Sequence, residues 1–104
     1  MIVRSWRGSV AKADRDRYFD YLKQTGLIAY QHTPGNRGVL ALRRDLEDRT
    51  EFLLLTFWDS EEAVKRFAGP DPSQAIFYPA DQDMLVEFDS FADHYELLHH
   101  YVDL

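Results

Sequence analysis

The sequence contains no cysteine among its 104 residues. This absence excludes disulfide bonds, thiolate zinc sites, iron–sulfur clusters and a cysteine nucleophile together. The sequence also lacks an apolar run near the roughly 20 residues of a membrane-spanning helix, and a basic, then apolar leader at its N-terminus. We therefore expect one cytoplasmic domain, since a chain of this length suits a single domain.

Positive charge is scarce as well. Acidic residues exceed basic ones by 18 to 12, so the formal net charge is −6 and the sequence pI is near 5.0. Non-specific nucleic-acid binding depends on clustered positive charge, whereas the arginines and lysines here are interleaved with acids. We expect neither a nucleic acid nor a membrane as a partner. Aromatic residues are plentiful at 14%, which suits either a generous core or the walls of a site for a flat apolar ligand.

The stretch 51–67 carries the clearest structural pattern in the chain. Phe52–Trp58 is an apolar run of strand length, which predicts a strand buried on both faces. Asp59 and Glu62 have the spacing of a capping box, and the apolar residues that follow recur at helical intervals. Gly69 then predicts the end of that helix. A tryptophan is thus expected at the carboxyl end of a buried strand, next to a helix N-terminus.

Alternation, helical spacing and turn residues predict the other elements. These are a strand over Ile2–Gly8, a helix over Arg15–Tyr30 with Asp14 as its N-cap, a strand over Arg37–Arg44, one or two helical turns in Asp81–Phe88, and a strand over Ser90–Leu98. This order is that of a ferredoxin-like α+β fold, with a four-stranded antiparallel sheet and two helices on one face. Because an apolar second face cannot be left to water, we infer a homodimer whose two sheets face each other.

Several short motifs point to a known family. The chain has Trp6 and Gly8 in its first strand, Pro-Gly-Asn-Arg-Gly at 34–38, Thr-Phe-Trp-Asp-Ser at 56–60 followed by Glu62-Ala63 and Phe67-Ala68-Gly69, and His94-Tyr95-Glu96 near its end. Together these motifs resemble the antibiotic biosynthesis monooxygenase family. The resemblance implies a single dimeric α+β barrel domain over residues 1–104. The family includes cofactor-free oxygenases of polyketide anthrones, haem-degrading enzymes, quinol oxygenases and members with no known reaction.

The sequence departs from the family pattern at two places. Some polyketide oxygenases of the family carry an asparagine four residues before the tryptophan that Trp58 matches, and that position is Leu54 here. Haem-degrading members place an iron-binding histidine after the tryptophan, and this chain has no histidine between Asp59 and Ala92. The resemblance therefore disfavours haem degradation, and we expect no cofactor.

His94 is the first candidate catalytic residue. A histidine, with an unperturbed pKa near ~6.5, is a natural acceptor of a proton from a phenol or an anthrone. A cofactor-free oxygenase needs that step because it turns the substrate into an electron-rich anion that can itself reduce dioxygen. The structural alternative is a histidine held by a neighbouring strand or by the partner subunit.

Two tryptophans and one arginine form the next group of candidates. Trp58, whose position matches the family's site, is the second catalytic candidate, and Trp6 is a substrate-binding one, because both indoles could wall a flat aromatic substrate. Arg4 lies beside Trp6 on the same strand face and would stabilise an enolate or phenolate through charge-assisted hydrogen bonds. The alternatives are two core tryptophans and an arginine in a salt bridge at an edge or dimer interface.

The remaining candidates lie in loops and in the tail. Phe77 and Tyr78 are predicted either as a lid over the pocket or as anchors that hold a long loop to the core. Asn36 is a candidate oxyanion donor, with a purely structural turn residue as the alternative. The adjacent His99 and His100 would point to opposite faces of a strand, so we expect no metal site.

These observations predict a cofactor-independent monooxygenase that oxidises an aromatic polyketide-type substrate, anthrone- or hydroquinone-like, with dioxygen. A cyclase or isomerase on the same fold would use the same base without oxygen. A non-enzymatic small-molecule-binding or stress-response module is the third alternative.

Overall fold

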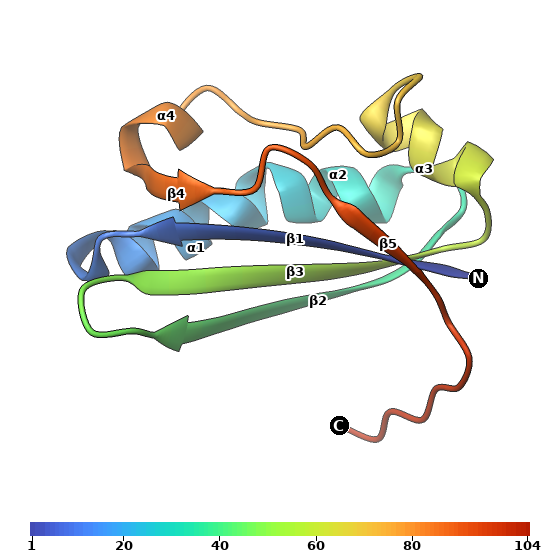
Figure 1. Cartoon of the computed structure of the whole chain (residues 1–104), viewed down its shortest axis with the longest axis horizontal. Helices are drawn as coiled ribbons and strands as arrows, with labels where there is room; N and C mark the ends of the chain where they lie inside the picture. Colours follow the sequence, from blue (N-terminus) through green and yellow to red (C-terminus); the bar gives the residue numbers. More distant parts are fainter.

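The computed structural model describes all 104 residues as one antiparallel sheet with helices on one of its faces (Figure 1). The elements are β1 (Ile2–Val10), η1 (Lys12–Asp14), α1 (Arg15–Gln24), α2 (Gly26–His32), β2 (Asn36–Asp45), β3 (Thr50–Trp58), α3 (Glu61–Ala68), α4 (Asp81–Met84), β4 (Leu85–Phe88) and β5 (Asp93–Glu96). The strand order is β2-β3-β1-β4, and β5 also pairs with β1. The predicted ferredoxin-like α+β fold is confirmed.

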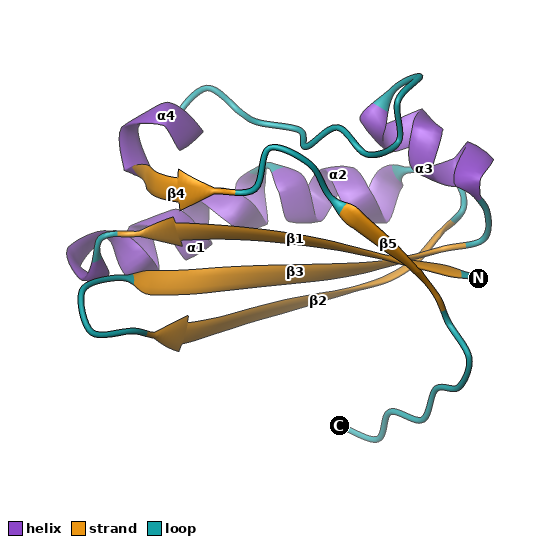
Figure 2. Ribbon diagram, viewed as in Figure 1, coloured by secondary structure: helices purple, strands orange, loops and turns teal.

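Strand β3 lies in the middle of the sheet, paired with β1 along its whole length and with β2 on its other side. Its residues alternate strictly between buried and half-buried positions. Phe52, Leu54 and Trp58 are buried under the helices, whereas Leu53 and Leu55 face the uncovered side. The prediction of burial on both faces is therefore wrong for the single chain, because the helices cover only one face (Figure 2).

The predicted helix over residues 15–30 is broken into α1 and α2 at Thr25, whose backbone leaves the helical region. The Thr25 hydroxyl donates a 2.8 Å hydrogen bond to the main-chain oxygen of Tyr21, a contact that commonly bends helices. Gly26 then starts α2, and a Cβ there would meet only ordinary contacts, so no close helix-to-sheet approach explains this glycine. Asp14 occupies the N-cap position of α1 without capping it; its carboxylate pairs with Arg17 instead.

Helix α3 covers Glu61–Ala68, but its N-cap is not the Asp59 of the predicted capping box. The Ser60 hydroxyl accepts the main-chain N–H of Ala63 at 3.2 Å, so Ser60 is the N-cap. Asp59 is engaged outside the helix, where its carboxylate pairs with Arg37. The end of the helix at Gly69 is as predicted, since this residue has a φ of 92° that favours glycine.

The final part of the chain supplies two short strands along the same edge of β1. Strand β4 pairs with residues 8–10 of β1, and β5 pairs with residues 2–5. The helical turn predicted within Asp81–Phe88 is present as α4, but strand β4 then follows at Leu85. The predicted strand over Ser90–Leu98 is too long, because β5 covers only four residues. No helix in the structure combines the length and apolar character needed to cross a membrane.

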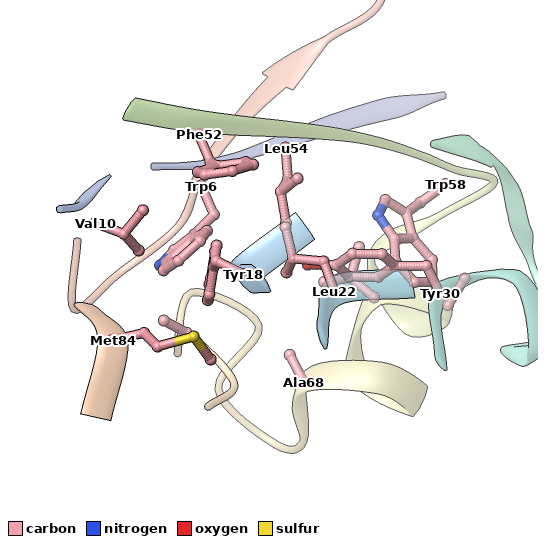
Figure 3. Packing of buried hydrophobic residues seen from close by; sticks show 13 residues of the cluster. Trp6, Val10, Tyr18, Leu22, Tyr30, Phe52, Leu54, Trp58, Ala68 and Met84 are labelled. Atoms are coloured by element: carbon pink, nitrogen blue, oxygen red, sulfur yellow. The ribbon is translucent and has the colours of Figure 1, made fainter. Parts of the chain in front are cut away.

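The hydrophobic core lies between the sheet and the helices, and aromatic side chains form much of it (Figure 3). Trp58, Tyr30 and Phe67 pack together at one end, with 4.6 to 6.4 Å between ring centroids. The Trp6 ring lies over Gly8, where a Cβ would collide with the indole. The core is thus assembled from two aromatic groups, one at each end of the sheet.

Candidate functional site

An enclosed cavity of about 20 Å³ lies between the sheet and helices α1 and α2. This volume holds about one water molecule. Strand residues form its floor, helix residues form one wall, and the segment before α4 closes it. The lining residues are Arg4, Trp6, Tyr18, Leu22, Gly26, Tyr30, Leu54, Ile76, Tyr78 and Asp81.

Arg4 brings a buried cation to this cavity. Its side chain is on the helix-covered face of β1, and the residue is only 2% exposed. Nη2 donates a 2.7 Å hydrogen bond to the main-chain oxygen of Gln74, whereas Nε has no partner. The guanidinium lies 5.5 Å from the centre of the Phe67 ring and interacts with the Tyr30 hydroxyl. Burial lowers the pKa of Arg4, because no carboxylate pairs with it.

Asp81 brings a buried carboxylate to the same cavity. It is 5% exposed and accepts the main-chain N–H of Tyr78 at 2.6 Å. The Tyr18 side chain lines the same cavity. Burial raises the pKa of Asp81, and burial followed by the nearby Asp81 charge raises the pKa of Tyr18. Burial also raises the pKa of Tyr30 to about 12, against the opposing effect of Arg4.

Residues 69–80, here called the cover segment, close the cavity from above. They are held by the Arg4 bond to Gln74 and by the main-chain N–H of Ala80, which donates to the Tyr21 hydroxyl at 2.9 Å. The Phe77 ring meets the Trp6 ring edge-on, with 6.2 Å between centroids. A surface hollow of about 400 Å³ adjoins the segment; it is lined by Phe77, Asp81, Gln82, Leu85 and Phe88. Asp81 borders both this hollow and the enclosed cavity.

His94 lies on β5 directly opposite Arg4 in the sheet register, so both side chains are on the helix-covered face. It does not line the enclosed cavity, and it is largely exposed. Partial burial, and then the Arg4 charge, lowers the pKa of His94 below its ordinary value. The histidine is therefore neutral, and able to accept a proton, at neutral pH.

The other predicted site residues are distributed over three places. Trp6 and Tyr78 line the cavity, and Phe77 covers it from outside. Trp58 is fully buried behind Tyr30, and its indole N–H donates to the Thr56 hydroxyl at 2.7 Å. Asn36 lies outside the cavity, where its side chain accepts the main-chain N–H of Gly38.

Sequence reasoning missed Tyr18, Tyr30 and Asp81. Helical spacing marks both tyrosines only as core positions, and Asp81 follows a loop whose path the sequence does not reveal. No group of three or more histidine, aspartate or glutamate side chains is placed to hold a metal ion. The polar groups that meet at the cavity are thus one arginine, one carboxylate and the tyrosine hydroxyls, whereas His94 lies outside it, on β5.

Comparisons with known proteins agree on the fold. The family model for antibiotic biosynthesis monooxygenase matches residues 1–77. A Bacillus cereus protein assigned to the antibiotic biosynthesis monooxygenases has a TM-score of 0.67 at 16% identity, over 98% of this chain and 97% of that one. A MhuD variant with two manganese protoporphyrin IX molecules per active site has a TM-score of 0.63 at 17% identity, over 99% and 100% of the two chains.

The haem degrader MhuD from Mycobacterium tuberculosis, with two haems in its active site, has a TM-score of 0.60 at 16% identity, over 98% and 100% of the chains. No curated protein matches the sequence. Identities this low show a shared fold and nothing finer.

Proposed function

This chain belongs to the antibiotic biosynthesis monooxygenase family, and we propose that it oxidises an aromatic, anthrone- or hydroquinone-like substrate with dioxygen and without a cofactor. The reaction is assigned to the space between the sheet and the helices, under the cover segment. The whole chain, residues 1–104, is proposed to act as one domain of a homodimer.

The single observation that carries this proposal is the state of Arg4. A buried cation without a counter-ion costs folding free energy, and aromatic rings and a tyrosine hydroxyl surround this one. An arginine that keeps one N–H unpaired in such a place suits a ligand oxygen that carries negative charge. A phenolate or enolate is the anion that an aromatic cavity accommodates best.

The chemistry balances without an external reductant. Loss of a proton from the substrate gives a delocalised anion whose oxygen Arg4 stabilises. The anion transfers an electron to dioxygen, and the radical pair then forms a carbon–oxygen bond, which gives a peroxide. Protonation and loss of water turn the reacting methylene into a carbonyl, so that one oxygen atom enters the product and the other leaves as water. The substrate supplies all four electrons.

His94 is proposed as the base that takes this first proton, from the hydroxyl of a hydroquinone or of the enol form of an anthrone, and its lowered pKa supports this role. Trp6 would pack against the substrate and form one side of its site. Trp58 would position Tyr30 and Phe67, whose rings it contacts. Phe77 and Tyr78 would serve as the lid, because an aromatic substrate is far larger than the enclosed cavity and enters only if the cover segment moves.

Haem does not fit the residues present at this cavity. No histidine lines it, so its residues offer no imidazole ligand for haem iron. We derive no step through haem for this chain.

The homodimer is proposed from the uncovered face of the sheet. In the registers of β1, β2 and β3, six apolar residues share that face, beside Arg7, Arg44 and Glu51: Val3, Leu40, Leu42, Leu53, Leu55 and Phe57. Here this set is called the open-face patch. Burying it against the same patch of a second copy removes it from water, as a layered α+β fold requires.

Oxygen uptake with anthrone or hydroquinone, without added cofactor, tests the proposal. We expect uptake above the spontaneous rate, at least about tenfold slower in Arg4→Met and His94→Ala. His32→Ala is the matched control, since His32 is exposed at the end of α2. Unchanged uptake in His94→Ala would remove that residue from the mechanism.

Three results would contradict the proposal. Substrate conversion that continues without oxygen would favour a cyclase or isomerase, and a ligand bound unchanged would favour a binding module. Tight haem binding with a shifted Soret band would favour the haem alternative. In each case oxygen uptake with the aromatic substrates would be absent.

A further inference from the structure

The cavity holds two opposite charges that do not pair with each other. Arg4 and Asp81 both line it and are both at least nine-tenths buried, yet no salt bridge includes either residue. Each is instead held by a neutral group, Arg4 by the Gln74 carbonyl and Asp81 by the main-chain N–H of Tyr78. Burying two unpaired charges in one small space is costly unless a ligand uses them. The proposed function uses Arg4 and leaves Asp81 without a role.

We propose that Asp81, together with Tyr18, which lines the same cavity, is the proton-transfer pair that expels water from the oxidised substrate. This inference rests on the proposed function and adds two catalytic residues to it. The proton that leaves the substrate at first still goes to His94.

The two charged groups reach the cavity from different elements, Arg4 from β1 and Asp81 from the start of α4. The Arg4 guanidinium is over Phe67, which packs against Tyr30 and Trp58. Tyr18 packs edge-on against Phe52, and Figure 3 shows it near Trp6, away from Trp58. In an anthrone the oxygen and the reacting carbon lie across one ring from each other. A substrate whose oxygen meets Arg4 therefore directs its reacting carbon towards Tyr18 and Asp81.

The step assigned to this pair is the conversion of the hydroperoxide to the ketone. Asp81 removes the remaining hydrogen of the reacting carbon as a proton. The electron pair of that carbon–hydrogen bond forms the carbonyl, the oxygen–oxygen bond breaks, and the departing hydroxide takes the proton of the Tyr18 hydroxyl. Protonated Asp81 then returns a proton to Tyr18, which lines the same cavity. One water molecule leaves and both side chains recover their starting states.

The position of Asp81 also suits a substrate that arrives from outside. It borders both the enclosed cavity and the surface hollow beside Phe77. A substrate that moves from the hollow under the cover segment therefore passes this carboxylate. Asp83, two residues along α4, is exposed and borders neither space. It provides a matched control for a change of aspartate to asparagine.

The experiment measures oxygen consumed, quinone formed and organic peroxide present, in single time courses with anthrone as the probe. The wild type should form about one quinone per oxygen with little peroxide. Asp81→Asn and Tyr18→Phe should keep oxygen uptake while quinone formation lags, so that the peroxide-to-quinone ratio rises at least about tenfold. Asp83→Asn should match the wild type, and His94→Ala should lose oxygen uptake and quinone together.

Other outcomes overturn the inference. If Asp81→Asn forms quinone as fast as it consumes oxygen, the carboxylate has no part in the dehydration. If Asp81→Asn loses oxygen uptake as well, the carboxylate acts before the substrate reacts with dioxygen and not in the later dehydration. If Asp81→Asn does not fold, Tyr18→Phe replaces it in the test, because this variant keeps the buried ring. The same comparison of quinone formed with oxygen consumed then decides whether the pair takes part in the dehydration. A wild-type protein that consumes no oxygen overturns the proposed function itself, a result distinct from a changed ratio in the variants.

Discussion

Arg4 and Gln74 are 70 residues apart in the chain and joined by a 2.7 Å hydrogen bond from the guanidinium to the main-chain oxygen. The bond connects the first strand of the sheet to the cover segment. The same arginine lines the cavity, and its Nε has no hydrogen-bond partner. A ligand anion that attracts Arg4 would therefore also change how the cover segment is held.

Replacement of Arg4 by methionine should loosen the cover segment. The Gln74 oxygen loses a charged donor, and such a hydrogen bond contributes about 1.5–3 kcal/mol. Amide hydrogen exchange over residues 73–76 should become about tenfold faster or more. Arg7→Met is the control, because Arg7 lies on the opposite face of β1 and pairs at the surface with Glu51. Equal exchange in both variants would show that Arg4 does not hold the segment.

Replacement of Asp81 by asparagine should raise the melting temperature at neutral pH. Burial raises the pKa of this carboxyl, so above the unfolded pKa of about 3.9 the folded state holds the proton longer than the unfolded state does. Folding stability from this group is therefore lost as the pH rises through the folded pKa. Asparagine still accepts the Tyr78 N–H and carries no charge.

Thermal unfolding of Asp81→Asn at pH 3 and pH 7 measures this effect. The gain should be present at pH 7 and absent at pH 3, and exposed Asp83→Asn should show neither. A lower melting temperature at pH 7 would mean that the charge of Asp81 stabilises the fold.

The titration of His94 should follow the charges beside it. Burial and then Arg4 lower its pKa, whereas Asp93 opposes them. The NMR titration midpoint of the His94 ring should lie below about 6.5. Arg4→Met should raise it and Asp93→Asn should lower it further. Because the unfolded chain takes up this proton first, stability from His94 is lost as the pH falls through that range. A midpoint above 6.5 would contradict the assignment.

Helix α3 should depend on Ser60 rather than on Asp59. Ser60→Ala leaves the Ala63 N–H without its partner and should cost about 1 kcal/mol of unfolding free energy. Asp59→Ala removes an exposed ion pair with Arg37 and should lower the unfolding free energy by at most a few tenths of a kcal/mol. Urea denaturation of both variants measures the difference, and a larger loss for Asp59→Ala would restore the capping-box interpretation.

A charge in the open-face patch should disrupt the proposed dimer. Leu55 is half-buried on the central strand, so glutamate there need not disturb the core. We expect Leu55→Glu to weaken dimerisation by about two orders of magnitude or more, since it would bury an unpaired charge between the sheets. Light scattering across a dilution series measures this, with exposed Lys23→Glu on α1 as the control. A dimer unaffected by Leu55→Glu would be formed through another surface.

The most successful sequence predictions came from local patterns. The apolar run of β3, the helical spacing of α3 and the glycine at its end depend on neighbouring residues, and all three elements are present. The Thr25 break and the change from α4 to β4 were not predicted. The first depends on a hydrogen bond from the Thr25 hydroxyl to the main chain, and the second on the pairing of β4 with distant β1. The spacing of apolar residues along a helix predicts neither.

The sequence by itself determined the order of the elements, the family and the residue types available for chemistry. It could place Arg4 and Trp6 on one face of a strand because side chains alternate with a period of two. Only the tertiary structure decided that Arg4 is buried, that Asp81 shares its cavity and that His94 stands opposite it at the edge. These relationships join residues that are about 75 to 90 positions apart in the sequence. They arise from the return of the chain over the sheet, since burial and unpaired charge are properties of the whole packing and not of any local pattern.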